Sequence, residues 1–98
     1  MSAFFVATVT IKDVDKFQEY AAKSKATFDL FDAEILIKGK YQDTLTGNAT
    51  HQTVAIVKFK DMDTLDKWYQ SDEYQALAPL RNQAADMTIT KYVVPVVL

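Results

Sequence analysis

The sequence predicts an α+β domain in which a four-stranded antiparallel sheet carries two helices on one face. Segments rich in β-branched and aromatic residues alternate with amphipathic helical segments in the order βαββαβ. A length of 98 residues suits one hydrophobic core, so we expect a single domain over residues 1–98. With 49% hydrophobic and 24% charged residues, the chain is expected to be folded throughout.

The first strand is expected from Phe4 to Ile11, because both of its faces carry apolar or β-branched residues. Asp13 then offers a side-chain acceptor to the first free amides of a helix. Residues at spacings of three and four mark the buried stripe of that helix: Val14, Phe17, Ala21, Ser24, Phe28 and Phe31.

Two further strands are expected to be joined by a turn. Glu34 to Lys40 has too short an apolar run for a helix, whereas Thr53 to Phe59 is apolar on both faces. The segment between them contains the turn-forming residues Asp43, Thr46, Gly47 and Asn48. The strand from Thr53 should therefore lie centrally, beside the first strand.

The second helical segment is expected to be interrupted. Asp61 or Asp63 can cap its start, and Ser71 can cap a following turn. Pro79 either opens a short new segment or bends the preceding one. A last strand from Met87 to Val94 completes the order, which is that of a ferredoxin-like fold.

One face of this sheet is left without a helix, because two helices cover only one side. If Phe5, Val9 and Ile11 face the helices, the other face carries Phe4, Val6, Thr8, Thr10, Val54, Ile56 and Lys58. Burying a large aliphatic side chain is worth about 1.5–3 kcal/mol, so a second copy packed sheet on sheet would stabilise the protein. We therefore expect a homodimer through the open sheet face, with the apolar tail Val93 to Leu98 along the partner subunit.

Composition excludes several other partners. The formal charge of -2 and the absence of clustered Lys and Arg argue against nucleic acid. No apolar run approaches the roughly 20 residues of a membrane span. The chain has no cysteine, which excludes disulfides and thiolate zinc sites, and the expected location is cytoplasmic.

Two residues are candidates for proton transfer. His51, the only histidine, has a suitable intrinsic pKa for a general base, although a lone loop histidine more often has a surface role. Lys38 is the other candidate, and with Lys58, Thr8 and Thr10 it could line a cavity between two sheets. No metal-binding spacing or Gly-rich phosphate loop is present, so no metal or cofactor is expected. For the further hypothesis of haem binding, the sequence offers a single imidazole ligand, that of His51.

Trp68, Tyr74 and Arg81 form an aromatic and basic set around the second helical segment. They could line a pocket in which Arg81 binds an acidic ligand group in fork geometry. Alternatively, Trp68 and Tyr74 belong to the core and Arg81 extends along them to water.

The stretch from Trp68 to Arg81 resembles the signature of the DUF1330 family. Val54 to Phe59 resembles the family's strand before its second helix, and Leu45-Thr46-Gly47 is similar to its Leu-Glu-Gly turn. The resemblance covers most of the chain, from Phe4 to Tyr92. It implies a small bacterial protein of uncharacterised function with a dimeric α+β barrel fold.

Three positions depart from the family pattern. Lys38-Gly39-Lys40 stands where the family often has Arg-Gly-Gly, Thr46 replaces its turn glutamate, and Asp32-Ala33 replaces a glycine pair. A lysine cannot bind a planar carboxylate in a bidentate way. The wider superfamily includes cofactor-free monooxygenases, haem-degrading enzymes and lactone isomerases, which use the cavity between sheet and helices; this likeness of fold names no reaction.

Two functional hypotheses follow. The first is a protein that binds or converts a small organic molecule in a barrel cavity, with Trp68, Tyr74 and Arg81 shaping the site and His51 or Lys38 moving protons. The alternative is a non-enzymatic dimerisation or stress-associated interaction module without a ligand. Threonine and lysine mixed into an apolar sheet face favour the first hypothesis.

Overall fold

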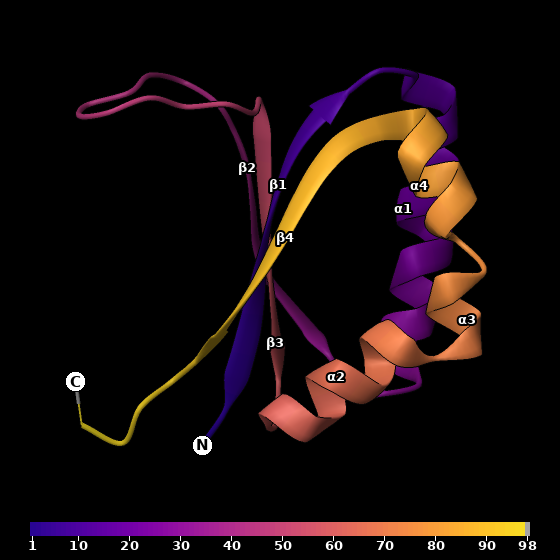
Figure 1. Cartoon of the computed structure of the whole chain (residues 1–98), viewed down its shortest axis with the longest axis vertical. Helices are drawn as coiled ribbons and strands as arrows, with labels where there is room; N and C mark the ends of the chain where they lie inside the picture. Colours follow the sequence, from indigo (N-terminus) through magenta and orange to yellow (C-terminus); the bar gives the residue numbers. More distant parts are fainter. Residues whose placement is uncertain (98) are drawn as a thin grey trace.

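The computed structural model describes residues 1–97 and has all its helices on one side of a single sheet (Figure 1). The elements along the chain are β1 (Ala3–Ile11), α1 (Val14–Asp29), β2 (Glu34–Lys40), β3 (Thr53–Phe59), α2 (Met62–Gln70), α3 (Asp72–Gln75), α4 (Ala78–Ala84) and β4 (Ala85–Val93). The sheet is antiparallel, with strand order β2-β3-β1-β4. The predicted ferredoxin-like arrangement is confirmed, including the central position of β1 and β3.

Two helices begin at predicted caps. The Asp13 side chain accepts a hydrogen bond from the Lys16 amide at 3.1 Å. Asp61 caps α2 by accepting from the Thr64 hydroxyl at 2.6 Å and from the Thr64 amide at 2.8 Å. These hydrogen bonds from Thr64 hold the pKa of Asp61 below its ordinary value, because they favour the ionised carboxylate.

The predicted interruption after α2 is also confirmed. Ser71 ends α2 in extended backbone, and its hydroxyl accepts from the Tyr74 amide at 3.2 Å to cap α3. Pro79 lies in the first turn of α4, where a missing amide proton costs no hydrogen bond. The breaks turn α4 so that it runs beside α1 (Figure 1).

The core lies between the sheet and the helices. Phe5, Val57 and Phe59 from the central strands are buried, and the Trp68 ring stacks on Phe5 with 5.1 Å between ring centroids. Trp68 and Tyr74 are the largest fully buried side chains among residues 1–97. A cluster of aromatic rings therefore joins α2 and α3 to the sheet.

The buried stripe of α1 differs from the prediction at its start. The buried positions are Tyr20, Ser24, Thr27 and Phe28, whereas the expected Val14 is 62% exposed. Val14 stands about 80° around the helix axis from Ser24, at the margin of the stripe. Within the layer of helices, α1 lies closer to α4 than to any strand.

The strand β2 contains a bulge at Leu36, because Ile35 and Ile37 pair with successive residues of β3. An extra residue reverses the alternation of side chains beyond it. Lys38 therefore lies on the helix side of the sheet. It is separated from Thr8, Thr10 and Lys58, with which it was expected to line one cavity.

The other side of the sheet carries no helix. Phe4, Val6 and Ile56 are half-buried there, and the Phe4 ring stacks on Tyr92 at 5.2 Å. After β4 the chain extends away from the helices (Figure 1), and Val96 and Val97 are exposed. Leu98, the end of the expected apolar tail, lies outside the described residues. None of the helices within residues 1–97 is long and apolar enough to cross a membrane.

Candidate functional site: two cavities that share a wall

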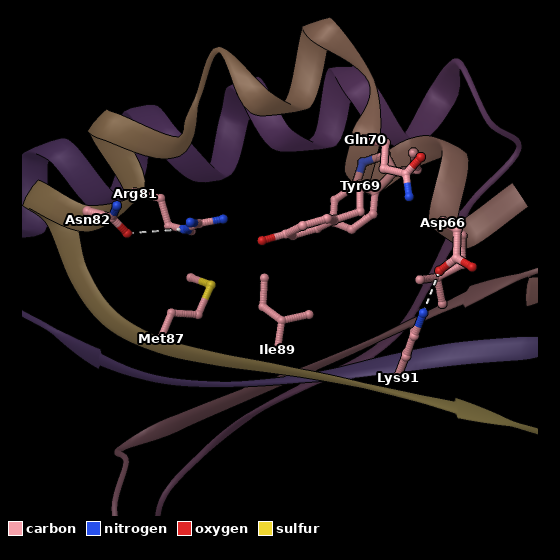
Figure 2. Close-up of a pocket in the computed structure, with 10 residues that line it drawn as sticks. Asp66, Tyr69, Gln70, Arg81, Asn82, Met87, Ile89 and Lys91 are labelled. Atoms are coloured by element: carbon pink, nitrogen blue, oxygen red, sulfur yellow. Dashed lines mark hydrogen bonds and ion pairs between the residues drawn. The ribbon is translucent and has the colours of Figure 1, made fainter.

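A pocket of about 360 Å³ lies between α2, α4 and β4 (Figure 2). We call it the Arg81 pocket. Met87 and Ile89 rise from β4 to form its apolar floor, and Tyr69 and Arg81 extend toward each other from the two helices (Figure 2). Trp68 also lines the pocket, with its ring centroid 6.1 Å from that of Tyr69. The site thus combines an aromatic wall, an apolar floor and a cation.

The Arg81 guanidinium is held on two sides. Its Nη1 donates to the Tyr74 hydroxyl at 3.1 Å, and its Nε donates to Asn82 Oδ1 at 3.3 Å. Partial burial alone would lower the pKa of Arg81, but hydrogen bonding to Tyr74 and the nearby Tyr69 outweigh burial and raise it. Within residues 1–97 Arg81 forms no salt bridge with a carboxylate. The pocket therefore contains a fixed, unpaired positive charge.

The opposite end of the pocket is electrically balanced. Lys91 Nζ donates to Asp66 Oδ1 at 2.7 Å, which joins β4 to α2 (Figure 2). The Lys91 ammonium is thereby neutralised locally. An anionic ligand would accordingly be drawn toward Arg81.

The structure separates the roles of the three predicted ligand residues. Trp68 Nε1 donates to Thr27 Oγ1 at 2.9 Å, so its only polar group is already satisfied. Tyr74 is fully buried and does not line the pocket, yet it orients Arg81. Trp68 and Tyr74 are core residues that support the pocket, and Arg81 is the member of the set whose charged group lines it.

A second cavity, of about 420 Å³, lies between α1 and the sheet. We call it the α1 cavity. Its walls are mainly apolar, and its polar lining includes Tyr20 and Ser24 from α1 and Lys38 at the β2 edge of the sheet. Met87 and Ile89 line both cavities. The gap exists because α1 leans on α4 and stands away from the strands.

A hydrogen-bond chain links the two cavities. The Tyr20 hydroxyl, in the α1 cavity, lies 2.7 Å from the Tyr74 hydroxyl, which in turn accepts from Arg81. Burial, and then proximity to Tyr74, raise the pKa of Tyr20 above its ordinary value. Sequence reasoning missed Tyr20 entirely. Its spacing of four from Ser24 places both hydroxyls on one helix face, but only the tertiary gap shows that this face lines a cavity.

His51 lies at neither cavity. Its Nδ1 is 3.0 Å from Thr10 Oγ1 and its Nε2 is 3.3 Å from Thr88 Oγ1, on the helix-free side of the sheet. The structure therefore does not bring His51 together with Lys38 or Arg81. No group of His, Asp and Glu side chains within residues 1–97 is arranged to hold a metal ion.

A family model described as "Domain of unknown function (DUF1330)" matches residues 2–94. The chain belongs to the DUF1330 family. The resemblance seen in the stretch from Trp68 to Arg81 is thereby confirmed over nearly the whole chain. No curated protein matches the DUF1330 chain significantly.

Solved structures share the fold at low identity. A protein of unknown function from Rhodopseudomonas palustris is 12% identical, with a TM-score of 0.82 over 96% of this chain and 82% of that one. SnoaB, a cofactor-independent oxygenase from Streptomyces nogalater, is 13% identical, with a TM-score of 0.71 over 99% and 96% of the two chains. A dimeric ferredoxin-like protein of unknown function from Jannaschia sp. is 10% identical, with a TM-score of 0.74 over 96% and 100%. At such identities the likeness concerns the fold alone.

Proposed function

We propose that this DUF1330 protein binds a small organic acid in the Arg81 pocket. The observation that carries the proposal is the guanidinium of Arg81, which Tyr74 and Asn82 fix in place without any carboxylate to neutralise it. A charge held in this way is ready for a ligand, because little side-chain freedom remains to be lost on binding.

The pocket suits an acid with an apolar body. A carboxylate can accept two parallel hydrogen bonds from a guanidinium, and Arg81 retains N–H groups that no described residue uses. The body of the ligand would lie between the Tyr69 ring and the floor formed by Met87 and Ile89 (Figure 2). A volume of about 360 Å³ lies within the usual range for small-molecule sites. The shared fold of a cofactor-independent oxygenase supports a small-molecule role, and names no reaction for this chain.

Calorimetric titration with benzoate and benzamide would test the proposal, because the two ligands differ in charge and have nearly the same shape. We expect wild-type protein to bind benzoate at least tenfold more tightly, as charge-assisted hydrogen bonds are worth about 1.5–3 kcal/mol. Arg81→Gln should lose this preference. Lys25→Gln, which removes an exposed positive charge on α1, should keep it.

Equal losses in the two variants would assign the preference to general electrostatics and contradict the role of Arg81. Absence of binding by the wild type, together with a stable dimer, would favour the alternative of an interaction module without a ligand. Conversion of a bound acid would be sought separately, by mass spectrometry of the acid after incubation.

We also propose that two copies associate through the helix-free sheet face. Support comes from the apolar side chains there: Phe4, Val6 and Ile56 are half-buried, and the Phe4 ring stacks on the exposed Tyr92. Several proteins of the same fold are described as dimeric. Ordinary water-facing sheet surfaces carry fewer large apolar groups in contact with one another.

Light scattering during size-exclusion chromatography would test the dimer. Ile56→Lys places a charge at the centre of the face and should yield monomers with an unchanged circular dichroism spectrum. Leu30→Lys changes an exposed apolar residue after α1, on the helix side, and should remain dimeric. A monomeric wild type, or a dimeric Ile56→Lys, would contradict this interface. The cytoplasmic location, bacterial origin and single domain over residues 1–98 remain predictions.

A further inference from the structure

We infer that the α1 cavity is a second binding site, specific for an uncharged, largely apolar molecule that presents a hydrogen-bond acceptor oxygen to Tyr20 and Ser24. This site is separate from the Arg81 pocket and does not depend on the function proposed for it. Two observations support this site: the direction of donation along the hydrogen-bond chain through Tyr74, and the buried Ser24 hydroxyl, which has no partner within the described chain.

Arg81 determines the direction of the hydrogen-bond chain. Its Nη1 donates to the Tyr74 oxygen, and Tyr74 is fully buried, so the Tyr74 proton needs a protein acceptor. The acceptor within reach among the described residues is the Tyr20 oxygen at 2.7 Å. Each group is satisfied when Arg81 donates to Tyr74 and Tyr74 donates to Tyr20. The proton of Tyr20 is then free to be donated elsewhere.

The protein offers this proton only a weak acceptor. Met87 Sδ lies 3.9 Å from the Tyr20 oxygen, and a thioether sulfur accepts hydrogen bonds poorly. Tyr20 lines the α1 cavity, so a ligand oxygen there would be a better acceptor. The chain thus delivers a donor to the cavity.

Ser24 supplies the second observation. It is 5% exposed and lines the same cavity, yet its Oγ has no hydrogen-bond partner within the described chain. Ser24 lies close enough to the Tyr20 hydroxyl to offset part of the rise in the pKa of Tyr20. The two side-chain oxygens nevertheless do not reach hydrogen-bond geometry. A buried hydroxyl left unpaired is costly, and a ligand that accepts from it would remove this cost. A carbonyl oxygen has two lone pairs and can accept from Tyr20 and Ser24 together.

The surrounding side chains define the rest of the ligand. Phe5, Phe17, Phe28, Val57 and Ile89 line the cavity and favour a compact apolar body. Burial raises the pKa of Tyr20, which shows that negative charge is disfavoured at this depth. Lys38 and Lys40 also line the cavity, but they are exposed residues of the edge strand β2, so their ammonium groups reach solvent. The chemical class indicated is an aromatic or alicyclic ketone, or a similar neutral carbonyl compound.

The test uses 1-tetralone and tetralin, which share a ring system and differ by one carbonyl group. Each is titrated into the full chain and followed by amide chemical shifts in NMR spectra. We expect 1-tetralone to bind at least about two- to tenfold more tightly than tetralin, which is the effect of one neutral hydrogen bond, and more tightly still when Tyr20 and Ser24 both donate. The shifts should map to α1 around Ser24, because the cavity lies against that helix.

Tyr20→Phe should remove most of the preference for 1-tetralone while leaving tetralin affinity unchanged, whereas a purely structural role of Tyr20 would weaken both ligands equally. Ser24→Ala should reduce the preference in part. Tyr41→Phe, which removes an exposed loop hydroxyl bonded to Thr44, serves as the control and should keep it.

Absence of binding by either compound would overturn the site. So would equal affinities in the wild type, a preference that survives both Tyr20→Phe and Ser24→Ala, or shifts that map to α4 around Asn82. None of these results would bear on benzoate binding at Arg81, so the two proposals can fail independently.

Discussion

The two cavities share Met87 and Ile89 as a wall, yet they differ in chemistry. The Arg81 pocket contains a cation without a salt bridge within the described chain, whereas the deep part of the α1 cavity offers hydroxyl groups among aromatic rings. A single hydrogen-bond chain through Tyr74 reaches both cavities. It restrains the Arg81 guanidinium on one side and orients the Tyr20 hydroxyl on the other. One buried tyrosine therefore contacts a charged group of one cavity and a neutral hydroxyl group of the other.

The difference originates in the helices. The unbroken α1 presents Tyr20 and Ser24 one turn apart and leaves a gap beneath them. The interrupted segment after α2 starts again at α4, where Pro79 opens a helix that brings Arg81 back over Tyr74. The continuous helix α1 thus lines the apolar cavity, and the interrupted segment after α2 forms the Arg81 pocket.

The largest effect is expected where one side chain supports both cavities. The Trp68 ring packs on Phe5 and Phe28, which line the α1 cavity, and Trp68 itself borders the Arg81 pocket. Trp68→Ala should lower the free energy of unfolding by about 3–5 kcal/mol, measured by urea denaturation. Both ligand affinities should fall together. Loss of one affinity alone would show that the cavities are supported independently.

Tyr74→Phe tests the link itself. The change leaves the ring in place but removes an acceptor from Arg81 and a donor from Tyr20. We expect destabilisation of about 1–3 kcal/mol, because buried polar groups lose partners. The preference for benzoate over benzamide and that for 1-tetralone over tetralin should both decrease in titrations of this variant. A variant that keeps both preferences would separate the two cavities.

Ser24→Ala should act in the opposite direction on stability. The variant removes a buried hydroxyl without a partner and introduces a better helix former, so the ligand-free protein should gain about 1 kcal/mol. Thermal unfolding with and without 1-tetralone would check this, and the ligand should stabilise the wild type more than the variant. A destabilised ligand-free variant would mean that Ser24 has a partner in solution.

The smallest effect concerns the Arg81 side alone. Asp61 caps the helix that carries Asp66 and Tyr69, and its pKa in the folded protein lies below the ordinary value of 3.8. Because the folded-state pKa is lowered, the ionised carboxylate stabilises the protein at pH values above the ordinary pKa. This stabilisation is lost as the pH falls through the folded-state pKa. Asp61→Asn keeps a side-chain oxygen that can accept the hydrogen bonds from Thr64, but this side chain does not titrate. Its stability should therefore decrease less than that of the wild type below pH 3.8, in unfolding curves measured across the acid range.

Much of the fold was predictable because it depends on local chemistry. Asp13, Asp61, Ser71 and Pro79 carry capping and breaking signals that act within a few residues, and the structure uses all four as expected. The prediction that Val14 is buried was wrong, because its spacing places it only at the margin of the buried stripe of α1. The interrupted second helical segment, which most determines the Arg81 pocket, was readable from Ser71 and Pro79 alone.

The sites were predictable only in part, because they depend on contacts distant in the sequence. Arg81 and its aromatic neighbours were recognised, but no local pattern distinguishes a core tyrosine such as Tyr74 from a pocket tyrosine. The pairing of Tyr20 with Tyr74 spans 54 positions, and the partners of His51 come from β1 and β4. Lys38 could not be assigned to a side of the sheet, because a bulge in β2 decides it.

That bulge allows β2 to change its length by one residue without changing its pairing. Deleting the single codon for Leu36 would remove the unpaired residue and restore strict alternation from Ile35 to Ile37. Lys38 would still lie opposite Ala55 and Lys40 opposite Thr53, so both side chains would stay on the helix side, at the α1 cavity. A relative that lacks the extra residue would therefore keep these charges at the cavity and away from the face through which we propose that two copies meet.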